Sequence, residues 1–232
     1  MKAMIDSTTS YSGGKAPSSP KGQQVRERIL AAALAAFGEK GFLATTTREI
    51  SLAAQVTLPA LQYYFGNKEG LYRACSEMVT EAYRGHMSEL GTAAREALAS
   101  NAPAREIRQH LFVLTAALAE FLIDSNQANN WALFVAREMS DPGGAFDILF
   151  KRLWQPGLLL TADLVARVRG QESRSVDSII EALMLVSGLM VFRSGRALTS
   201  RMFDGELSDE EVLQKVKATL KRQITAMKPP KE

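Results

Sequence analysis

Few residues of this chain are suited to redox or metal chemistry. The sequence contains one cysteine and two histidines among 232 residues. Cys75 alone cannot form an intrachain disulfide, which suits the reducing conditions of the cytosol. Cys75, His86 and His110 also lack the close spacing that metal ligands share. We therefore expect a buried, structural cysteine, no metal site and no bound cofactor.

The sequence also lacks the signals of membrane, secreted and β-sheet proteins. No apolar run approaches the length of a transmembrane helix, and residues 1–19 contain no apolar segment typical of a signal peptide. Strand-like alternation is missing, and only eight prolines occur, three of them near the chain ends. An all-α cytoplasmic protein without a membrane partner is predicted.

Motifs of common enzyme classes are missing as well. The chain has no glycine-rich phosphate loop, no HExxH pair and no nucleophile elbow. We therefore expect that the protein is not an enzyme. The alternative is an all-helical enzyme or ligand carrier, which would need a similar helical body.

Helical periodicity divides the chain into a small head and a larger body. Residues 1–19 are rich in Ser, Thr, Gly and Pro and are predicted to form a disordered tail. We place the head at residues 20–67 and the body at residues 68–227. The body is expected to contain helices over residues 68–99, 104–124, 128–139, 144–168, 175–193 and 208–227.

Capping residues in the head predict short helices joined by tight turns. The Gly-Glu-Lys-Gly segment at 38–41 is expected to end the first helix. Thr46, with Glu49 three residues later, is typical of a capping box that starts the second helix. Thr57 and Asn67 are predicted to cap the third and fourth helices.

The second and third of these helices have the layout of a helix-turn-helix DNA-binding motif. We assign Ile50, Leu52 and Ala53 to the apolar side of the second helix. The third helix carries aromatic and polar side chains that no core explains. Residues 21–75 contain seven Lys or Arg and four acidic residues, and this modest positive charge suits phosphate contact.

Three motifs occur in the head at fixed spacing: Ala-Phe-Gly-Glu-Lys-Gly-Phe at 36–42, Thr-Thr-Thr-Arg-Glu-Ile at 45–50, and Leu-Gln-Tyr-Tyr-Phe-Gly-Asn-Lys-Glu-Gly-Leu-Tyr at 61–72. Together they resemble the DNA-binding head of the TetR family of bacterial transcriptional repressors. In the body, Ala-Arg-Glu-Met-Ser-Asp-Pro at 136–142, Ala-Phe-Asp-Ile-Leu at 145–149 and Trp-Gln-Pro at 154–156 are similar to the C-terminal ligand domain of CerR-type (YbiH-like) members.

The resemblance implies a homodimeric repressor of the bacterial cytoplasm. Such a protein binds a palindromic double-stranded DNA operator and is released by a small-molecule effector. One recognition helix covers too few base pairs for selective binding, so two heads on neighbouring half-sites are expected. An activator or a nucleoid-like DNA binder with the same head stays open as an alternative.

The resemblance also implies which head residues contact DNA. Thr46, Thr47, Tyr64 and Lys68 are expected to bind phosphate, and helix N-termini favour such contacts. Arg48 and Gln62 are the leading candidates for base contacts. The full predicted set is Thr46, Thr47, Arg48, Thr57, Leu58, Pro59, Ala60, Gln62, Tyr63, Tyr64 and Lys68.

Alternatives remain for several of these residues. Arg48 and Lys68 would otherwise be solvated surface charges, and Tyr63 and Tyr64 would be core aromatics. Leu58 and Pro59 are apolar where family members often carry a polar residue or glycine. This difference favours contact with thymine methyls or recognition of DNA shape.

The apolar segment at 175–193 is the candidate dimer face. Its predicted interface residues are Ile179, Ile180, Leu183, Met184, Ser187 and Met190. The second helix of this interface would come from 212–225 or from 154–168. The alternative is that 175–193 is the core helix of a monomer.

Aromatic residues on the middle helices suggest a ligand pocket. The predicted lining is His110, Phe112, Phe121, Trp131, Phe134, Arg137 and Met139. Aromatic and methionine side chains at helical spacing also fit an ordinary core, which is the alternative. Arg137 and Glu138 are charges among apolar neighbours, so they are interpreted as a buried pair or a polar anchor.

Overall fold

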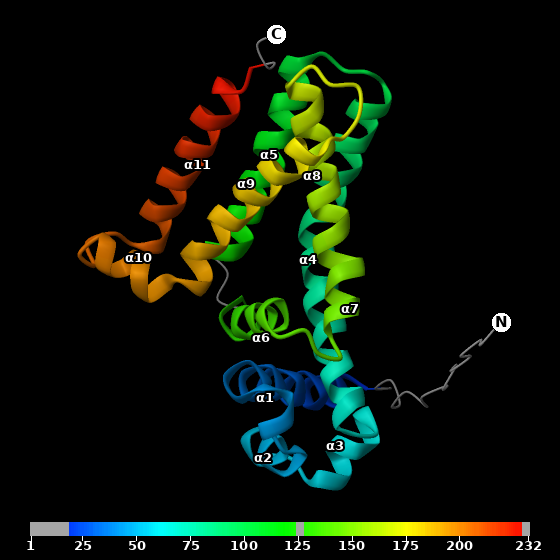
Figure 1. The fold of residues 1–232 in the computed structure, drawn as a ribbon. Helices are drawn as coiled ribbons and strands as arrows, with labels where there is room; N and C mark the ends of the chain where they lie inside the picture. The colour runs from blue at the N-terminus through cyan, green and yellow to red at the C-terminus, as the bar shows by residue number, and fades with distance from the viewer. Residues whose placement is uncertain (1–18, 124–127, 229–232) are drawn as a thin grey trace, which may run out of the picture.

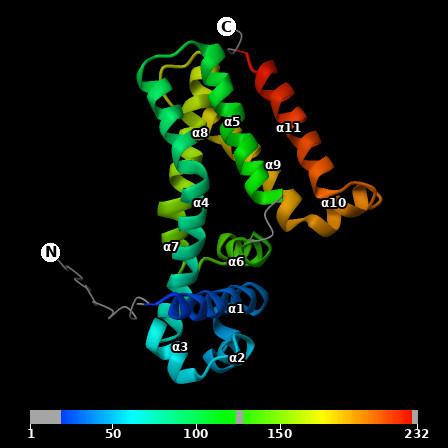
Figure 2. The same cartoon turned by 180° about the vertical axis from the view of Figure 1, so that it is seen from behind.

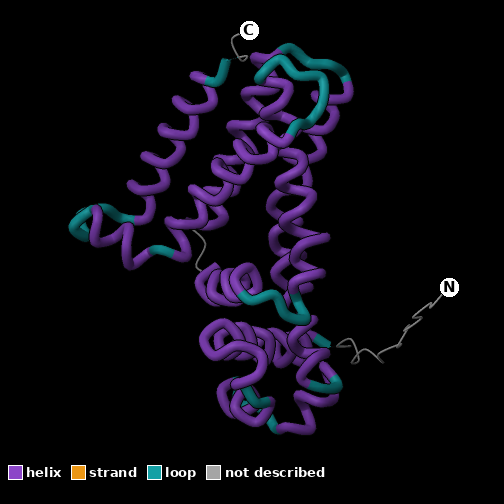
Figure 3. The backbone as a smooth tube through the Cα atoms, in the orientation of Figure 1, coloured by secondary structure: helices purple, strands orange, loops and turns teal. Residues whose placement is uncertain are grey.

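The computed structural model describes residues 19–123 and 128–228, and every element in these ranges is a helix (Figures 1 and 3). The all-α prediction is therefore confirmed. The predicted tail at 1–19 lies outside the described residues except for Ser19, which caps the first helix. No helix of the described ranges is long and apolar enough to cross a membrane.

The helices follow the predicted order, with additions in the body. The head contains α1 (Pro20–Ala44), α2 (Thr47–Ala53) and α3 (Leu58–Phe65). The body contains α4 (Lys68–Ala99), α5 (Ala104–Ile123), α6 (Ala128–Ser140), α7 (Phe146–Leu149), η1 (Phe150–Trp154), α8 (Gln155–Val168), α9 (Val176–Ser194), α10 (Arg196–Met202) and α11 (Asp209–Ala226).

The predicted caps fix the starts of the head helices. The side chain of Thr46 accepts a hydrogen bond from the backbone N–H of Glu49 at 3.2 Å. Thr57 does the same for α3, and Asn67 accepts from Gly70 N at 2.8 Å at the start of α4. The Glu49 carboxylate pairs with Lys40 of α1, and a hydrogen bond with the Thr46 backbone also helps to lower its pKa, as the predicted capping box requires.

Two details of the head differ from the sequence interpretation. Gly41 breaks α1 with a φ of 80°, a conformation that glycine adopts without steric cost. The chain then resumes a helical turn to Ala44, so the helix kinks rather than ends at residues 38–41. Leu52 is 80% exposed and Ala53 is also exposed. Ile50 and Ala54, one turn apart, already fill the core-facing side of this seven-residue helix.

Two helices connect the head to the body. The 32-residue helix α4 begins next to the head and runs the length of the body, and α6 lies across the base of the body against α1 (Figures 1 and 2). The hydrophobic core of the head includes Trp131, Phe134 and Val135 of α6 together with Phe37 of α1. The head is thus packed onto α6 as well as attached through α4.

The predicted helix over 144–168 is three successive segments. Helix α7 begins at Phe146, and η1 is a π-helical stretch before α8. Pro156 explains the change, because it has no N–H to donate to the carbonyl four residues back and its ring would clash there. The backbone widens accordingly, and Gln155 N–H donates to Phe150 O, five residues back.

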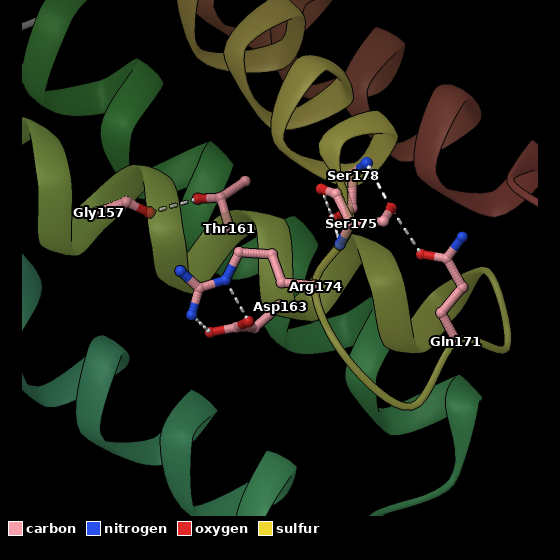
Figure 4. Close-up of polar contacts among 7 residues, drawn as sticks. All are labelled: Gly157, Thr161, Asp163, Gln171, Arg174, Ser175 and Ser178. Atoms are coloured by element: carbon pink, nitrogen blue, oxygen red, sulfur yellow. Dashed lines mark hydrogen bonds and ion pairs between the residues drawn. The ribbon is translucent and has the colours of Figure 1, made fainter.

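The start of α9 is fixed on α8 by polar contacts (Figure 4). Arg174 donates from Nε and Nη2 to the two carboxylate oxygens of Asp163, at 2.7 and 3.1 Å. The Ser175 side chain accepts from the backbone N–H of Ser178, which completes a capping box. These contacts set the direction in which α9 presents its outer face.

Candidate DNA interface and effector cavity

None of the eleven predicted DNA-contact residues is buried. Six are exposed, namely Thr46, Arg48, Thr57, Pro59, Gln62 and Tyr63. Five are half-buried, namely Thr47, Leu58, Ala60, Tyr64 and Lys68. Buried residues of the same helices, Ile50, Leu61 and Phe65, hold α2 and α3 on the head core. The arrangement leaves the predicted set accessible to a partner.

Helix N-termini in the head are capped by side chains that keep hydrogen-bonding capacity. The Thr46 and Thr57 hydroxyl oxygens each accept a backbone N–H, and their O–H groups can still donate outward. The free N–H groups and the dipole at a helix start favour an anion. The starts of α2, α3 and α4 therefore combine exposed donors with positive potential.

Lys68 is held in position at the start of α4. Its Nζ atom donates to the backbone oxygen of Leu43 at 3.4 Å and lies 4.5 Å from the centre of the Phe42 ring. A cation over an aromatic face is electrostatically attracted, which limits the freedom of the long side chain. The half-buried ammonium retains donors for a phosphate oxygen.

Tyr63 and Tyr64 differ in exposure. Their rings meet edge to face with centroids 5.2 Å apart. Tyr63 is 56% exposed, whereas Tyr64 is half-buried and packs against the head core. Tyr63 is therefore the more accessible of the two residues, although the sequence interpretation favoured Tyr64 as the main phosphate contact.

A cavity of about 370 Å³ lies in the body, and α4, α5, α6, η1, α8 and α9 all contribute to its wall. Its size falls in the range of small-molecule sites. Phe121 and Trp131, both predicted pocket residues, line it. Trp154, the other tryptophan of the chain, lines it from η1. The π-helical stretch after α7 therefore forms part of the cavity wall, a frequent location for such segments.

The other five predicted pocket residues, His110, Phe112, Phe134, Arg137 and Met139, do not line this cavity. Phe134 is fully buried in the head core, with its ring centre 5.0 Å from that of Tyr72. Met139 is 50% exposed. His110 lies one turn after Glu106 on α5, and Phe112 packs within the cores of the body. Helical spacing alone did not distinguish these core and surface positions from the cavity wall.

Arg137 and Glu138 join the head to the body and are not paired with each other. Arg137 donates from Nε to Gly38 O at 3.2 Å and from Nη2 to Glu39 O at 2.8 Å. Glu138, only 1% exposed, accepts the Tyr72 O–H at 2.5 Å and the Gly143 N–H at 3.2 Å. Burial and the neighbouring Glu138 carboxylate raise the pKa of Tyr72, so its hydroxyl stays a donor.

Gly38 allows this close packing, and sequence reasoning assigned it only to a helix end. A Cβ at Gly38 would lie 3.0 Å from both the Cβ of Leu133 and the backbone nitrogen of Phe134. Helix α6 therefore lies so close to α1 that a larger side chain at position 38 would push the two helices slightly apart. A glycine inside an otherwise apolar helix face was the signal available in the sequence.

Helix α9 has an outer apolar face without a partner in the described residues. Val176, Ile180, Leu183, Met184 and Val191 are exposed at helical spacing, and Met184 is 71% exposed. Ser187 lies on the same face. Ile179 and Met190, also predicted for the dimer interface, are half-buried, and Met190 lines the cavity. The predicted second interface helix at 212–225 already buries Leu213, Val216 and Leu220 within the monomer.

Comparison with protein families matches both parts of the chain. Residues 29–75 match the family described as bacterial regulatory proteins, tetR family. Residues 107–228, more than half of the chain, match the C-terminal domain of the HTH-type transcriptional dual regulator CecR. The CecR protein of Shigella flexneri is 29% identical over 204 residues, covering 86% of this chain and 89% of CecR.

Solved structures share the fold. A TetR-like transcriptional regulator from Rhodococcus sp. RHA1 has a TM-score of 0.53 and 20% identity, covering 88% of this chain and 97% of that one. FadR from Bacillus subtilis, crystallised with stearoyl-CoA, has a TM-score of 0.55 and 14% identity, covering 86% and 97%. At these identities the likeness concerns the fold alone.

Proposed function

Because this chain belongs to the TetR family of transcriptional regulators and carries a CecR-type C-terminal domain, we propose that it is a homodimeric repressor. The dimer binds a palindromic operator and dissociates from it when a small molecule binds. The observation that carries the proposal is the head surface, where the capped starts of α2 and α3 lie with exposed Arg48, Gln62 and Tyr63. The proposal places the protein in the bacterial cytoplasm.

The roles proposed for the head residues follow from their chemistry. Thr46, Thr47, Tyr63, Tyr64 and Lys68 bind phosphate oxygens and position α3 in the major groove. Such contacts carry affinity that depends on salt but little sequence information. The predicted set of eleven residues supplies both this positioning and the base contacts.

Base contacts are proposed for the remaining exposed side chains. Arg48 can donate two hydrogen bonds to guanine, and the amide of Gln62 can pair with adenine. Leu58, Pro59 and Ala60 contribute apolar contact at the start of α3, where thymine methyl groups are the complementary partners. The recognition helix therefore combines one or two hydrogen-bonding positions with an apolar edge.

A dimer is proposed through the outer face of α9. An exposed apolar face of this kind marks an interaction surface, and pairing it with its own copy would bury Ile180, Leu183 and Met184. Light scattering coupled to size exclusion at micromolar concentration should give twice the chain mass of 25.4 kDa. A monomer mass would contradict this part of the proposal.

Coupling between effector and DNA is proposed to run through α6 and α4. Trp131, Ala132 and Val135 of α6 line the cavity, while Arg137 and Glu138 of the same helix hold α1 and α4. An effector acts by binding more tightly to the state in which the two heads no longer match successive major grooves. The structure of FadR in complex with stearoyl-CoA supports the proposal that a body of this fold binds small molecules.

Selection of bound sequences from a random DNA pool by the purified full chain tests the DNA-binding function. We expect an enriched palindrome, and footprinting should protect this site over a short stretch at a promoter. Binding without any discrete site would favour a nucleoid-like binder and overturn the proposal.

Two variants separate the proposed roles within the head. Lys68→Ala should weaken binding about equally across sequences and reduce the salt slope by about one. Gln62→Ala should relax sequence preference at one position, at a discrimination cost of about 1–3 kcal/mol. A Lys68→Ala variant with an unchanged salt slope would show that this lysine does not contact phosphate.

Activation is the second candidate function. The relative from Shigella flexneri is described as a dual regulator. Transcription from the promoter carrying the selected site, measured with and without the protein in vitro, distinguishes the two. Repression alone is expected under the proposal, and increased transcript would assign an activating role.

A further inference from the structure

The cavity wall contains a buried guanidinium that nothing in the described residues neutralises. Arg193 of α9 lines the cavity and is only 7% exposed. Its Nη2 atom is buried and has no hydrogen-bond partner among the described residues. Among the described residues, the one other such nitrogen is Arg108 Nε, and its guanidinium already donates to Met227 O at 3.0 Å. Arg193 is therefore the unsatisfied charge of the described body.

Among the described residues, no carboxylate pairs with Arg193. Asp209, the carboxylate that acts on it electrostatically, is engaged by Arg196 at 2.7 Å. Burial, followed by the positive charge of Arg196, lowers the pKa of Arg193, which means that its surroundings disfavour the charge. A buried charge without a partner is costly, so its presence needs an explanation in function or in a partner group.

The rest of the wall defines the kind of group that would complete the site. Arg84, Arg95 and Arg152 also line the cavity, and no Asp or Glu of the described ranges 19–123 and 128–228 does so. Arg84 is already paired with Glu81 at the surface. The remaining lining is mainly apolar, including Leu114, Leu160 and Met190. In the part of the chain that the structure describes, the cavity lining therefore combines apolar side chains with cationic groups and contains no carboxylate.

We propose that the effector of this protein is an amphiphile with an apolar body and an anionic oxygen group, and that Arg193 binds this group. The inference rests on the proposed function, because it names the chemical class of that effector. A carboxylate or phosphate can accept two parallel hydrogen bonds from a guanidinium, which point-like cations do not offer. The Arg193 charge would then be neutralised only in the occupied state.

The two tryptophans of the chain give a direct readout, since Trp131 and Trp154 both line the cavity. The full-length protein is titrated with decanoate, decyl phosphate, 1-decanol and decyltrimethylammonium while tryptophan fluorescence is recorded. We expect both anions to bind roughly tenfold to a hundredfold more tightly than the alcohol, the range of a charged hydrogen bond. The ratio of decanoate to decyl phosphate affinity identifies which anionic group fits.

Matched variants assign the preference to Arg193. Arg193→Met should bring the affinity for decanoate down to that for 1-decanol and leave the alcohol affinity unchanged. Arg193→Lys should keep part of the preference, because it retains the charge without the paired donors. Arg201→Met, which removes an exposed arginine of α10, should behave as the original chain does.

Folding of the variants is checked by thermal unfolding. Removing an unpaired buried charge should leave the melting temperature of Arg193→Met unchanged or higher. Decanoate should then raise the melting temperature of the original chain but not that of Arg193→Met. Equal binding of anion and alcohol, or an anion preference that survives in Arg193→Met, would overturn the inference.

Operator release separates this inference from the proposed function. Anion binding that depends on Arg193 but leaves the operator complex intact at saturation would support the anion site. The same result would contradict the proposal that an effector releases the operator. If 1-decanol releases the operator as effectively as decanoate does, the proposed repressor function stands, but the inference that the effector must carry an anionic group is wrong.

Discussion

Replacing Tyr72 with Phe removes one hydroxyl from the joint between α4 and α6 and nothing else. Tyr72 O–H donates to the buried carboxylate of Glu138, whose only other donor among the described residues is Gly143 N–H. A hydrogen bond to a charged group contributes about 1.5–3 kcal/mol, and a buried acceptor left without it also loses solvation. For a chain of this length that loss corresponds to a decrease in melting temperature of roughly 3–12 °C.

Urea unfolding followed by circular dichroism measures this change as a free energy. The variant Glu138→Gln and the double variant complete a thermodynamic cycle, from which we expect a coupling of about 1.5 kcal/mol or more between the two side chains. Tyr63→Phe is the matched control, because the Tyr63 ring is exposed and its hydroxyl has no buried acceptor in the described chain. We expect this control to change stability by less than about 0.5 kcal/mol.

The same variant also tests the coupling between body and head. If Tyr72 and Glu138 hold the head in its DNA-binding orientation, Tyr72→Phe should weaken operator affinity even at temperatures where the protein is fully folded. Equal stabilities of Tyr72→Phe and Tyr63→Phe, or a coupling energy near zero in the cycle, would refute the assignment of this hydrogen bond as the joint.

The remaining predictions concern glycine positions and a helix cap. Gly38→Ala should destabilise the protein by about 1–3 kcal/mol, because its Cβ would meet α6 at 3.0 Å, whereas Gly85→Ala on α4 meets nothing within 4 Å and should stabilise by about 0.5–1 kcal/mol; thermal unfolding measures both. The backbone N–H and hydroxyl of Ser208 donate to Glu211 and hold its pKa below the usual range. Since the folded pKa is the lower one, this stabilisation is complete above about pH 4.5 and is lost as pH falls through the folded pKa. Glu211→Gln should therefore lose less stability than the original chain between about pH 5 and pH 3, and an identical acid profile would contradict the cap.

Local signals predicted most of the helix starts. Thr46, Thr57 and Asn67 were predicted as caps from residue type alone, and each accepts the expected backbone N–H. Ser208 with Glu211 likewise forms a capping box at the start of α11, where a helix over 208–227 was predicted. A cap depends on contacts within four residues, so the sequence contains all the information that is needed.

Features that depend on distant contacts were not predictable in this way. The seven-residue helix α10 has no side-chain cap and gave no signal. Phe134 and Trp131 are three residues apart on α6, yet Phe134 packs against Tyr72 at the start of α4 and Trp131 lines the cavity. Which of two apolar positions faces a core or a cavity depends on where α4 and α9 lie, and periodicity does not contain that placement.

The position of Arg193 at the cavity was not predictable from the sequence either. The sequence showed an arginine at the end of a very apolar helix, a position that also suits a favourable interaction with the helix dipole. Only the packing of α9 against α5 and α6 places this side chain at the cavity. A lone charge within an apolar segment is nevertheless a signal that could have drawn attention to it.

Helix α6 also provides a short, direct connection between the cavity and the head. From Trp131 at the cavity to Arg137 at the head carbonyls is six residues, which at a rise of 1.5 Å per residue is a lever of about 9 Å. A helix of this length is stiff, so we expect a displacement of α6 at Trp131 to be transmitted to the α1 carbonyls that Arg137 contacts. No relay of side chains is needed between the two ends. A genetic screen for variants that bind the operator but ignore the effector should therefore yield substitutions that loosen these two turns of helix.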